Sequence, residues 1–136
     1  MRMEQLVSLC EKAGIGHAGQ DLFIHYMNSS VSKGIVFLTS LTGDPIDWEL
    51  PGWRKSKAFQ AIVRDPSITS GYRRSEQLIS AITINTVTTL PAIAPDIPAI
   101  QVAYIRPIVD TIVYPRTPDK VFEFSTNFEA GFAVLP

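Results

Sequence analysis

The sequence predicts an α+β domain: a mixed or antiparallel β-sheet of four to five strands with two helices packed on one face. Two segments have the apolar spacing of amphipathic helices, several short runs are rich in β-branched and aromatic residues, and most links between them are short. The chain has 136 residues, of which 46% are hydrophobic, and a net charge of −1. This composition is enough for one core and is not typical of disorder. We therefore expect a single domain over residues 1–136.

The first helix is expected over residues 2–13. Gly14 follows it and suits a left-handed helix stop. The residues at i, i+3, i+4 and i+7 form one apolar face: Met3, Leu6, Val7 and Cys10.

Two strands are expected next, over residues 21–27 and 34–39. Both faces of the first run are largely apolar, which is typical of a central strand. The second run is short and rich in β-branched residues, and residues 28–32 between the two are turn-like. The two runs are therefore predicted to form a hairpin.

A long irregular loop is expected over residues 42–57, because Pro and Gly recur there without a steady apolar period. Loops of this length in a small domain are usually functional or covered by a partner. A third strand is expected over residues 58–64, where Asp65-Pro66 ends it.

The second helix is expected after Ser70 as its N-cap, with an inner face of Ser75, Leu78, Ile79 and Ile82. Residues 85–100 are rich in Pro and Thr and are expected to form a connection that includes a little strand. Residues 101–114 are expected to form one bent or edge strand, because Pro107 interrupts the run.

The last strand has the cleanest alternation in the chain, and its apolar face is expected to be buried against the helices. The residues of that face are Phe122, Phe124, Thr126, Phe128 and Ala130.

Residues that could carry chemistry are few. Residues 14–19 match G-x-G-x-x-G, but here a helix precedes the motif and a strand follows it, the reverse of a dinucleotide site. The histidines His17 and His25 are expected to be packed or on the surface, and no Gly-x-Ser-x-Gly elbow occurs. We expect no catalytic residue, no cofactor and no metal site.

Two further features bear on the compartment. The only cysteine, Cys10, excludes an internal disulfide and indicates a reduced compartment, or a virion assembled inside one. The N-terminus lacks the apolar run of a signal peptide, and prolines interrupt the least charged stretch, so we expect no membrane span.

Half of the basic residues lie between residues 54 and 74, opposed there only by Asp65. This stretch has three open interpretations: a solvated face, a nucleic-acid contact or a subunit contact. A net charge near zero argues against a general nucleic-acid binder. Acidic residues upstream, together with Glu123 and Glu129, could meet the basic stretch in a neighbouring copy.

Trp48 and Trp53 lie in the predicted loop, where aromatic residues either pin a loop to its own domain or anchor it in a partner. Both interpretations stay open. The hypothesis for an interface comprises Asp44, Asp47, Trp48, Glu49, Trp53, Arg54, Lys55, Lys57, Arg73 and Arg74.

Several short motifs between residues 52 and 128 together resemble a known family. They are Gly52-Trp53-Arg54, the run from Phe59 to Pro66, Gly71-Tyr72 with its helix, Tyr104-Ile105-Arg106-Pro107, Val113-Tyr114-Pro115-Arg116 and the strand from Phe122 to Phe128. This segment resembles the tail-terminator and minor capsid (tail completion) proteins of long-tailed bacteriophages.

The resemblance implies a small α/β sandwich without catalytic residues. It implies copies that assemble in the host cytoplasm into a ring, usually a hexamer, which caps the tail tube and meets the head connector or neck at the head-proximal end of the virion tail. The alternatives are another head–tail connector or tail completion protein, or a small nucleic-acid-binding module that uses residues 54–74.

Overall fold

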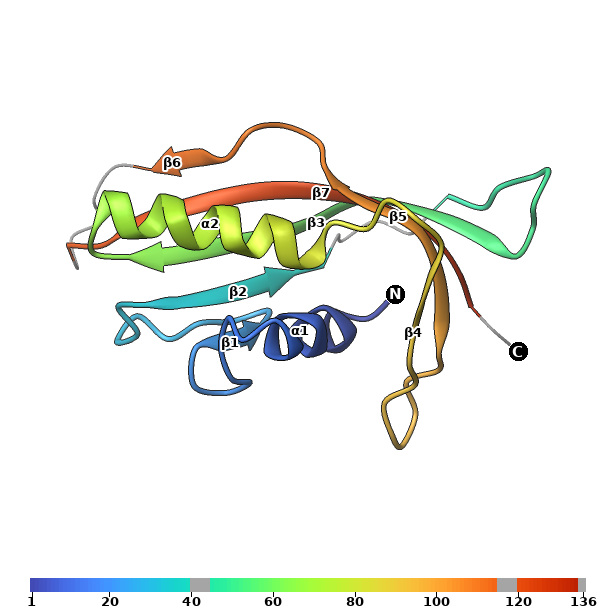
Figure 1. Cartoon of the computed structure of the whole chain (residues 1–136), viewed down its shortest axis with the longest axis horizontal. Helices are drawn as coiled ribbons and strands as arrows, with labels where there is room; N and C mark the ends of the chain where they lie inside the picture. The colour runs from blue at the N-terminus through green and yellow to red at the C-terminus, as the bar shows by residue number, and fades with distance from the viewer. Residues whose placement is uncertain (40–44, 115–119, 135–136) are drawn as a thin grey trace.

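The computed structural model describes residues 1–39, 45–114 and 120–134, without the side chains of residues 56–58 and 134. In this part of the chain, two helices and a seven-stranded mixed sheet are formed (Figure 1). The order is α1 (Met3–Lys12), β1 (Leu22–Ile24), β2 (Gly34–Leu38), β3 (Trp53–Asp65), α2 (Ile68–Ile82), β4 (Thr88–Leu90), β5 (Ile100–Pro107), β6 (Ile112–Tyr114) and β7 (Phe122–Val134). The α+β class is confirmed, and seven strands replace the expected four to five.

The sheet is built on two long strands, β3 and β7, of 13 residues each. The strand order is β1-β2-β3-β7-β5-β4, and β6 also pairs with β7. Among the strands of the described residues, β1 and β2 are the one pair that runs in parallel. Figure 1 shows β4 and β5 turning away from the line of β3 and β7, so the sheet is strongly curved.

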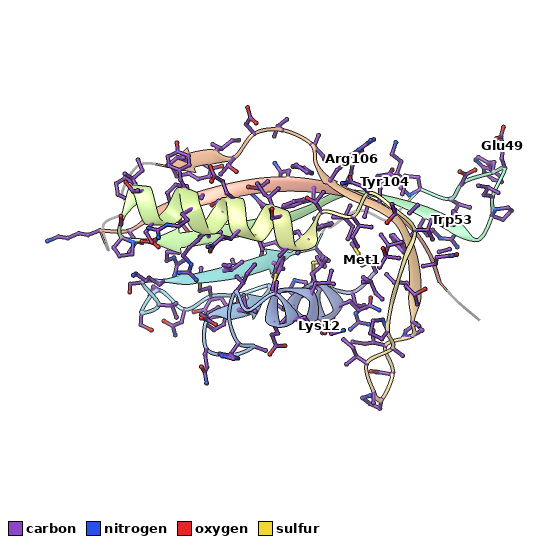
Figure 2. All side chains as sticks on the ribbon, in the orientation of Figure 1. Met1, Lys12, Glu49, Trp53, Tyr104 and Arg106 are labelled. Carbon is purple, nitrogen blue, oxygen red and sulfur yellow. The ribbon has the colours of Figure 1, made fainter. Side chains whose placement is uncertain are left out.

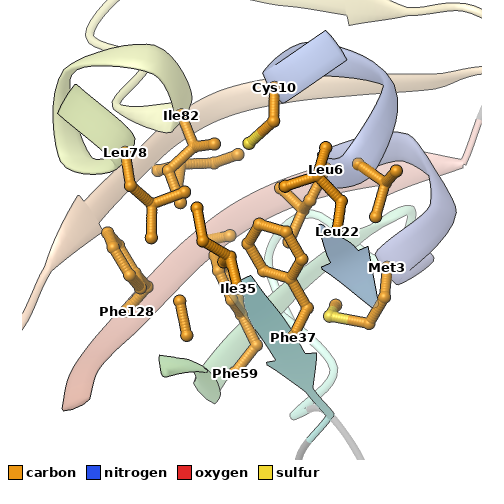
Figure 3. Packing of buried hydrophobic residues seen from close by; sticks show 14 of the residues in the cluster. Met3, Leu6, Cys10, Leu22, Ile35, Phe37, Phe59, Leu78, Ile82 and Phe128 are labelled. Atoms are coloured by element: carbon orange, nitrogen blue, oxygen red, sulfur yellow. The ribbon is translucent and has the colours of Figure 1, made fainter. Parts of the chain in front are cut away.

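Both helices pack on one face of this sheet. Side chains from α1, α2 and that face form one buried cluster, part of which is drawn in Figure 3. Phe59 of β3 stacks on Phe128 of β7 with 5.1 Å between ring centroids, and Leu78 and Ile82 of α2 belong to the same cluster. The expected placement of the helices is confirmed.

The apolar face of the last strand is also largely confirmed. Phe124 and Phe128 are fully buried, and Phe122 is partly buried at the edge of the cluster. The alternation of side chains along a strand directs these rings toward the helices, although Ser125 on the opposite face is also buried.

The predicted hairpin of residues 21–27 and 34–39 is wrong, because β1 and β2 pair in parallel and β1 lies at the edge of the sheet. The chain turns at His25, whose φ is 65°, and residues 25–33 carry it back to the start of β2. Arg64 of β3 donates hydrogen bonds to the carbonyls of Asn28 and Val31 and so holds this link against the sheet.

The second helix begins earlier than predicted. Ser67, not Ser70, is its N-cap and accepts a hydrogen bond from the backbone N–H of Ser70. The hydroxyl of Ser70 instead donates to the buried carboxylate of Asp65, at 2.9 Å. The turn between β3 and α2 is therefore built around Asp65.

Strand boundaries differ at two further places. β3 begins at Trp53, so the irregular stretch predicted over residues 42–57 includes the start of a strand. The predicted strand over residues 101–114 is two strands, β5 and β6. The little strand expected in the Pro-rich connection over residues 85–100 is β4, and the amide of Gln5 in α1 donates to the carbonyl of Pro98 there.

We expect Phe124→Ala to lower the free energy of unfolding by ~3–5 kcal/mol, because it leaves a cavity in the core between α2 and the sheet. Phe122→Ala is the matched control on the same face and should cost clearly less, since Phe122 is only partly buried. Urea unfolding followed by circular dichroism measures both. Equal costs would contradict the placement of the core.

Candidate assembly surface

Residues 45–52 form a structured projection, here called the finger, at one end of the sheet (Figure 1). It folds back onto the start of β3, where Ile46 bridges Arg54 and the N–H of Asp47 donates to the carbonyl of Trp53 at 3.3 Å. At the tip, the Asp47 carboxylate accepts hydrogen bonds from the N–H groups of Glu49 (2.9 Å) and Leu50 (3.0 Å). The finger therefore has a defined conformation before it meets any partner.

The two tryptophans have different environments. Trp48 is 90% exposed on the finger, whereas Trp53 is half-buried. Trp53 lines a depression of about 250 Å³ together with Leu50, Tyr104 and Gly131 (Figure 2). Trp53 thus attaches the finger to the sheet, and Trp48 is available for contact with another molecule.

The basic stretch predicted over residues 54–74 is divided between two ends of the molecule. Arg54 and Lys55 lie at the base of the finger, where Arg54 donates to the carbonyls of Pro51 and Trp53. Arg73 and Arg74 lie on α2, which begins beside the opposite end of β3 (Figure 1). The stretch therefore does not form one patch.

The remaining residues of the hypothesis are placed as follows. The guanidinium of Arg74 lies 3.9 Å from the buried carboxylate of Asp65, so the charge of Arg74 is paired with a charge of its own chain. Arg73 is exposed, as are Asp47 and Glu49. Asp44 and the side chain of Lys57 lie outside the described part of the chain.

The acidic residues of the last strand have partners within the chain. Glu123 lies 3.5 Å from Arg64, and Glu129 lies 2.6 Å from Arg106. Arg106 also stacks over the ring of Tyr104, at 4.8 Å from its centroid. That these carboxylates also meet a neighbour's basic surface stays a prediction.

The structure contains a second surface that sequence reasoning missed. A pocket of about 290 Å³, here called the α2 pocket, lies between residues 72–79 of α2 and residues 107–111. Tyr72 at its mouth and Ile68 one turn earlier are exposed. The sequence contained one indication of this surface, since Ile68 and Tyr72 are apolar residues at i and i+4 on the outer side of α2. Nothing in the sequence indicated that residues 107–111 lie beside them.

The glycine motif is a structural turn. Gly14 and Gly19 have φ of 75° and 81°, values that favour glycine. The carboxylate of Asp21 accepts a hydrogen bond from the N–H of His17 at 2.6 Å and occupies the space where a side chain of residue 16 would extend. A carboxylate in this position is unfavourable for a phosphate group.

Other chemical features of the described residues are few. No group of three or more His, Cys, Asp or Glu residues there could hold a metal ion. His17 and His25 are exposed, and burial raises the pKa of the Cys10 thiol to about 12, which disfavours the reactive thiolate. Neither α1 nor α2, the helices in the described part of the chain, is long and apolar enough to cross a membrane.

An exposed indole on a structured support is typical of a protein that works by binding other protein surfaces. The comparison with family models gives the same class. The model described as "Bacteriophage tail terminator protein" matches residues 10–94, more than half of the chain, and the chain belongs to this family. The chain is therefore a structural protein of the phage tail class.

A solved structure titled "Virion of native gene transfer agent (GTA) particle" contains a chain with a similar fold. The likeness has a TM-score of 0.60 and covers 96% of this chain and 90% of the other, at 8% sequence identity. At this identity the likeness establishes the fold alone. No curated protein sequence matches the chain.

We expect the two tryptophans to differ in their effect on stability. Trp48→Ala should change the free energy of unfolding of the isolated subunit by less than about 0.5 kcal/mol, because the side chain makes little contact. Trp53→Ala should lower it by about 1–3 kcal/mol, because half of a large apolar surface is lost. Thermal and urea unfolding of both variants measure this difference. A Trp48→Ala variant that unfolds would contradict the exposed placement.

Proposed function

We propose that this protein is a tail terminator that forms a homo-oligomeric ring, a hexamer, at the head-proximal end of the tail. The ring caps the tail tube and joins it to the head connector or neck protein, after assembly in the host cytoplasm. The single observation that carries the proposal is the family match over residues 10–94. In this proposal the protein has no catalytic role and needs no cofactor.

The surface of the subunit supports a role in assembly. A net charge of −1 opposes self-association only weakly. A finger with a fixed conformation and an exposed Trp48 loses little conformational entropy when it is covered. A ring presents one such finger per subunit, and several weak contacts made together hold far more tightly than one.

Two alternatives to a terminator are a nucleic-acid-binding module and another head–tail connector or tail completion protein. The division of the basic stretch, with Arg74 paired to Asp65 and Arg64 bound to backbone carbonyls, disfavours a nucleic-acid-binding module that uses residues 54–74. Another head–tail connector or tail completion role differs from a terminator in its effect on tube length.

The proposal is tested by mass and by tube length. Light scattering over a range of concentrations should give a closed oligomer of one mass, and negative-stain images should show rings. In an assembly reaction with the tail tube protein, added rings should stop the growth of tubes at a reproducible length. A strict monomer, or rings that leave tube growth unchanged, would contradict a terminator.

We expect no tight binding to duplex DNA. Phosphate binding through several Lys and Arg side chains would be strong at low salt and would fall steeply as salt rises. The titration compares the native protein with Arg73→Glu, which reverses an exposed charge away from the finger. Tight binding that salt and Arg73→Glu both abolish, while the oligomer persists, would favour the nucleic-acid module instead.

A further inference from the structure

Exposed large apolar side chains in the described part of the chain gather in two places. Soluble monomers rarely expose contiguous apolar patches without an interaction to make there. The finger carries Ile46, Trp48 and Leu50; α2 and residues 108–114 carry Ile68, Tyr72, Ile108, Val109, Ile112 and Tyr114; Tyr26 and Val87 lie outside both groups.

We propose that the finger of one copy inserts Trp48 into the α2 pocket of a second copy. The inference rests on the proposed function, since it names the contact that would join neighbouring subunits of the ring. One contact of this kind covers both exposed apolar groups in every copy.

The pocket and the indole match in size and in hydrogen bonding. At about 290 Å³ the pocket lies just below the range of ~300–1,000 Å³ for drug-sized ligands, so it suits one large side chain. The indole N–H is a donor only, and the carboxylates of Glu76 and Asp110, which line the pocket together with apolar residues, can accept its hydrogen bond.

The charges are complementary when the finger enters with its tip toward Arg73. Glu49 at the tip and Arg73 on α2 are both exposed, and neither has an ion pair in the described part of the chain. Lys55 at the base of the finger is exposed too, and its charge is opposite to those of Glu76 and Asp110 in the pocket. The polar rim thus sets the direction of entry, and the indole supplies most of the affinity.

The finger does not reach the α2 pocket of its own chain. Tyr72 contacts Phe124, which pairs with Val63 near the far end of β3. The finger joins β3 at Trp53, so the two surfaces are separated along the strand by roughly 30 Å. A contact between two different surfaces is heterologous, and it forms a closed ring when the rotation between neighbours closes.

Substitutions test whether Trp48 contributes more to association between subunits than another exposed apolar residue does. Trp48→Ala should raise the dissociation constant between subunits about 30-fold or more, as expected for a central tryptophan anchor. Val87→Ala is the matched control, since it removes an exposed apolar side chain outside both groups and should leave the constant unchanged. Dilution series followed by light scattering measure both. Equal constants for the two variants would overturn the proposal.

Cross-linking tests the direction of the contact. Ile46→Cys and Val109→Cys, which both keep Trp48, are prepared separately, mixed and treated with a short thiol-specific cross-linker; the native Cys10 is fully buried and does not compete. We expect a covalent dimer in the mixture and none in either variant alone. A dimer of Ile46→Cys with itself would overturn the proposal, because it places finger against finger.

The outcomes distinguish this inference from the proposed function. Rings that persist in Trp48→Ala while tube binding is lost would place the finger against the tail tube, which overturns the subunit contact and leaves a terminator intact. A native protein that neither associates nor limits tube length would overturn the proposed function itself.

Discussion

The antiparallel pairing of β3 with β7 is the interaction on which the rest of the molecule depends. It runs from Trp53 opposite Ala133 to Asp65 opposite Phe122, with one irregularity between Ser56 and Phe59. β2 pairs with the outer edge of β3, while β5 and β6 share the outer edge of β7. Because the two long strands carry the finger at one end and the start of α2 at the other, their length also fixes the distance between the two exposed apolar groups (Figure 1).

The position of α2 follows from two constraints at the end of β3. The buried carboxylate of Asp65 accepts a hydrogen bond from the N–H of Ser67 at 2.8 Å and lies near Arg74, which closes the turn. Gly71 then lets the helix approach β7, because a side chain there would collide with the ring of Phe124. Tyr72 packs edge-on against the same ring and forms one wall of the α2 pocket.

Local patterns in the sequence were sufficient for some elements and insufficient for others. The apolar periods of α1 and of β7 predicted both elements and their buried faces, since each depends on neighbours within a few residues. The parallel pairing of β1 with β2 could not be predicted, because it depends on a turn at His25 and on hydrogen bonds from Arg64, far away in the chain. The two tryptophans were recognised, but only the fold separates the one that packs from the one that is exposed.

The basic stretch illustrates the same limit at the level of the surface. Residues 54–74 are continuous in sequence, yet β3 makes up the first part of this stretch and separates its ends by most of its own length. A run of like charges becomes a patch only where the chain turns back on itself, as it does at a helix or a short hairpin. A long strand has the opposite effect, so charge runs that overlap long strands are weak indicators of a binding surface.

The stiffness of the elements that carry the two surfaces bears on how a subunit of this kind would assemble. In a heterologous contact, a small error in the rotation between neighbours accumulates around the assembly and decides between a closed ring and an open filament. The finger is held by backbone hydrogen bonds to β3 and by the Asp47 carboxylate, and α2 is held by the core. Both surfaces are therefore held to the same pair of strands. In the proposed ring this arrangement favours closure, because a flexible joint between finger and sheet would allow the subunits themselves to polymerise without closure.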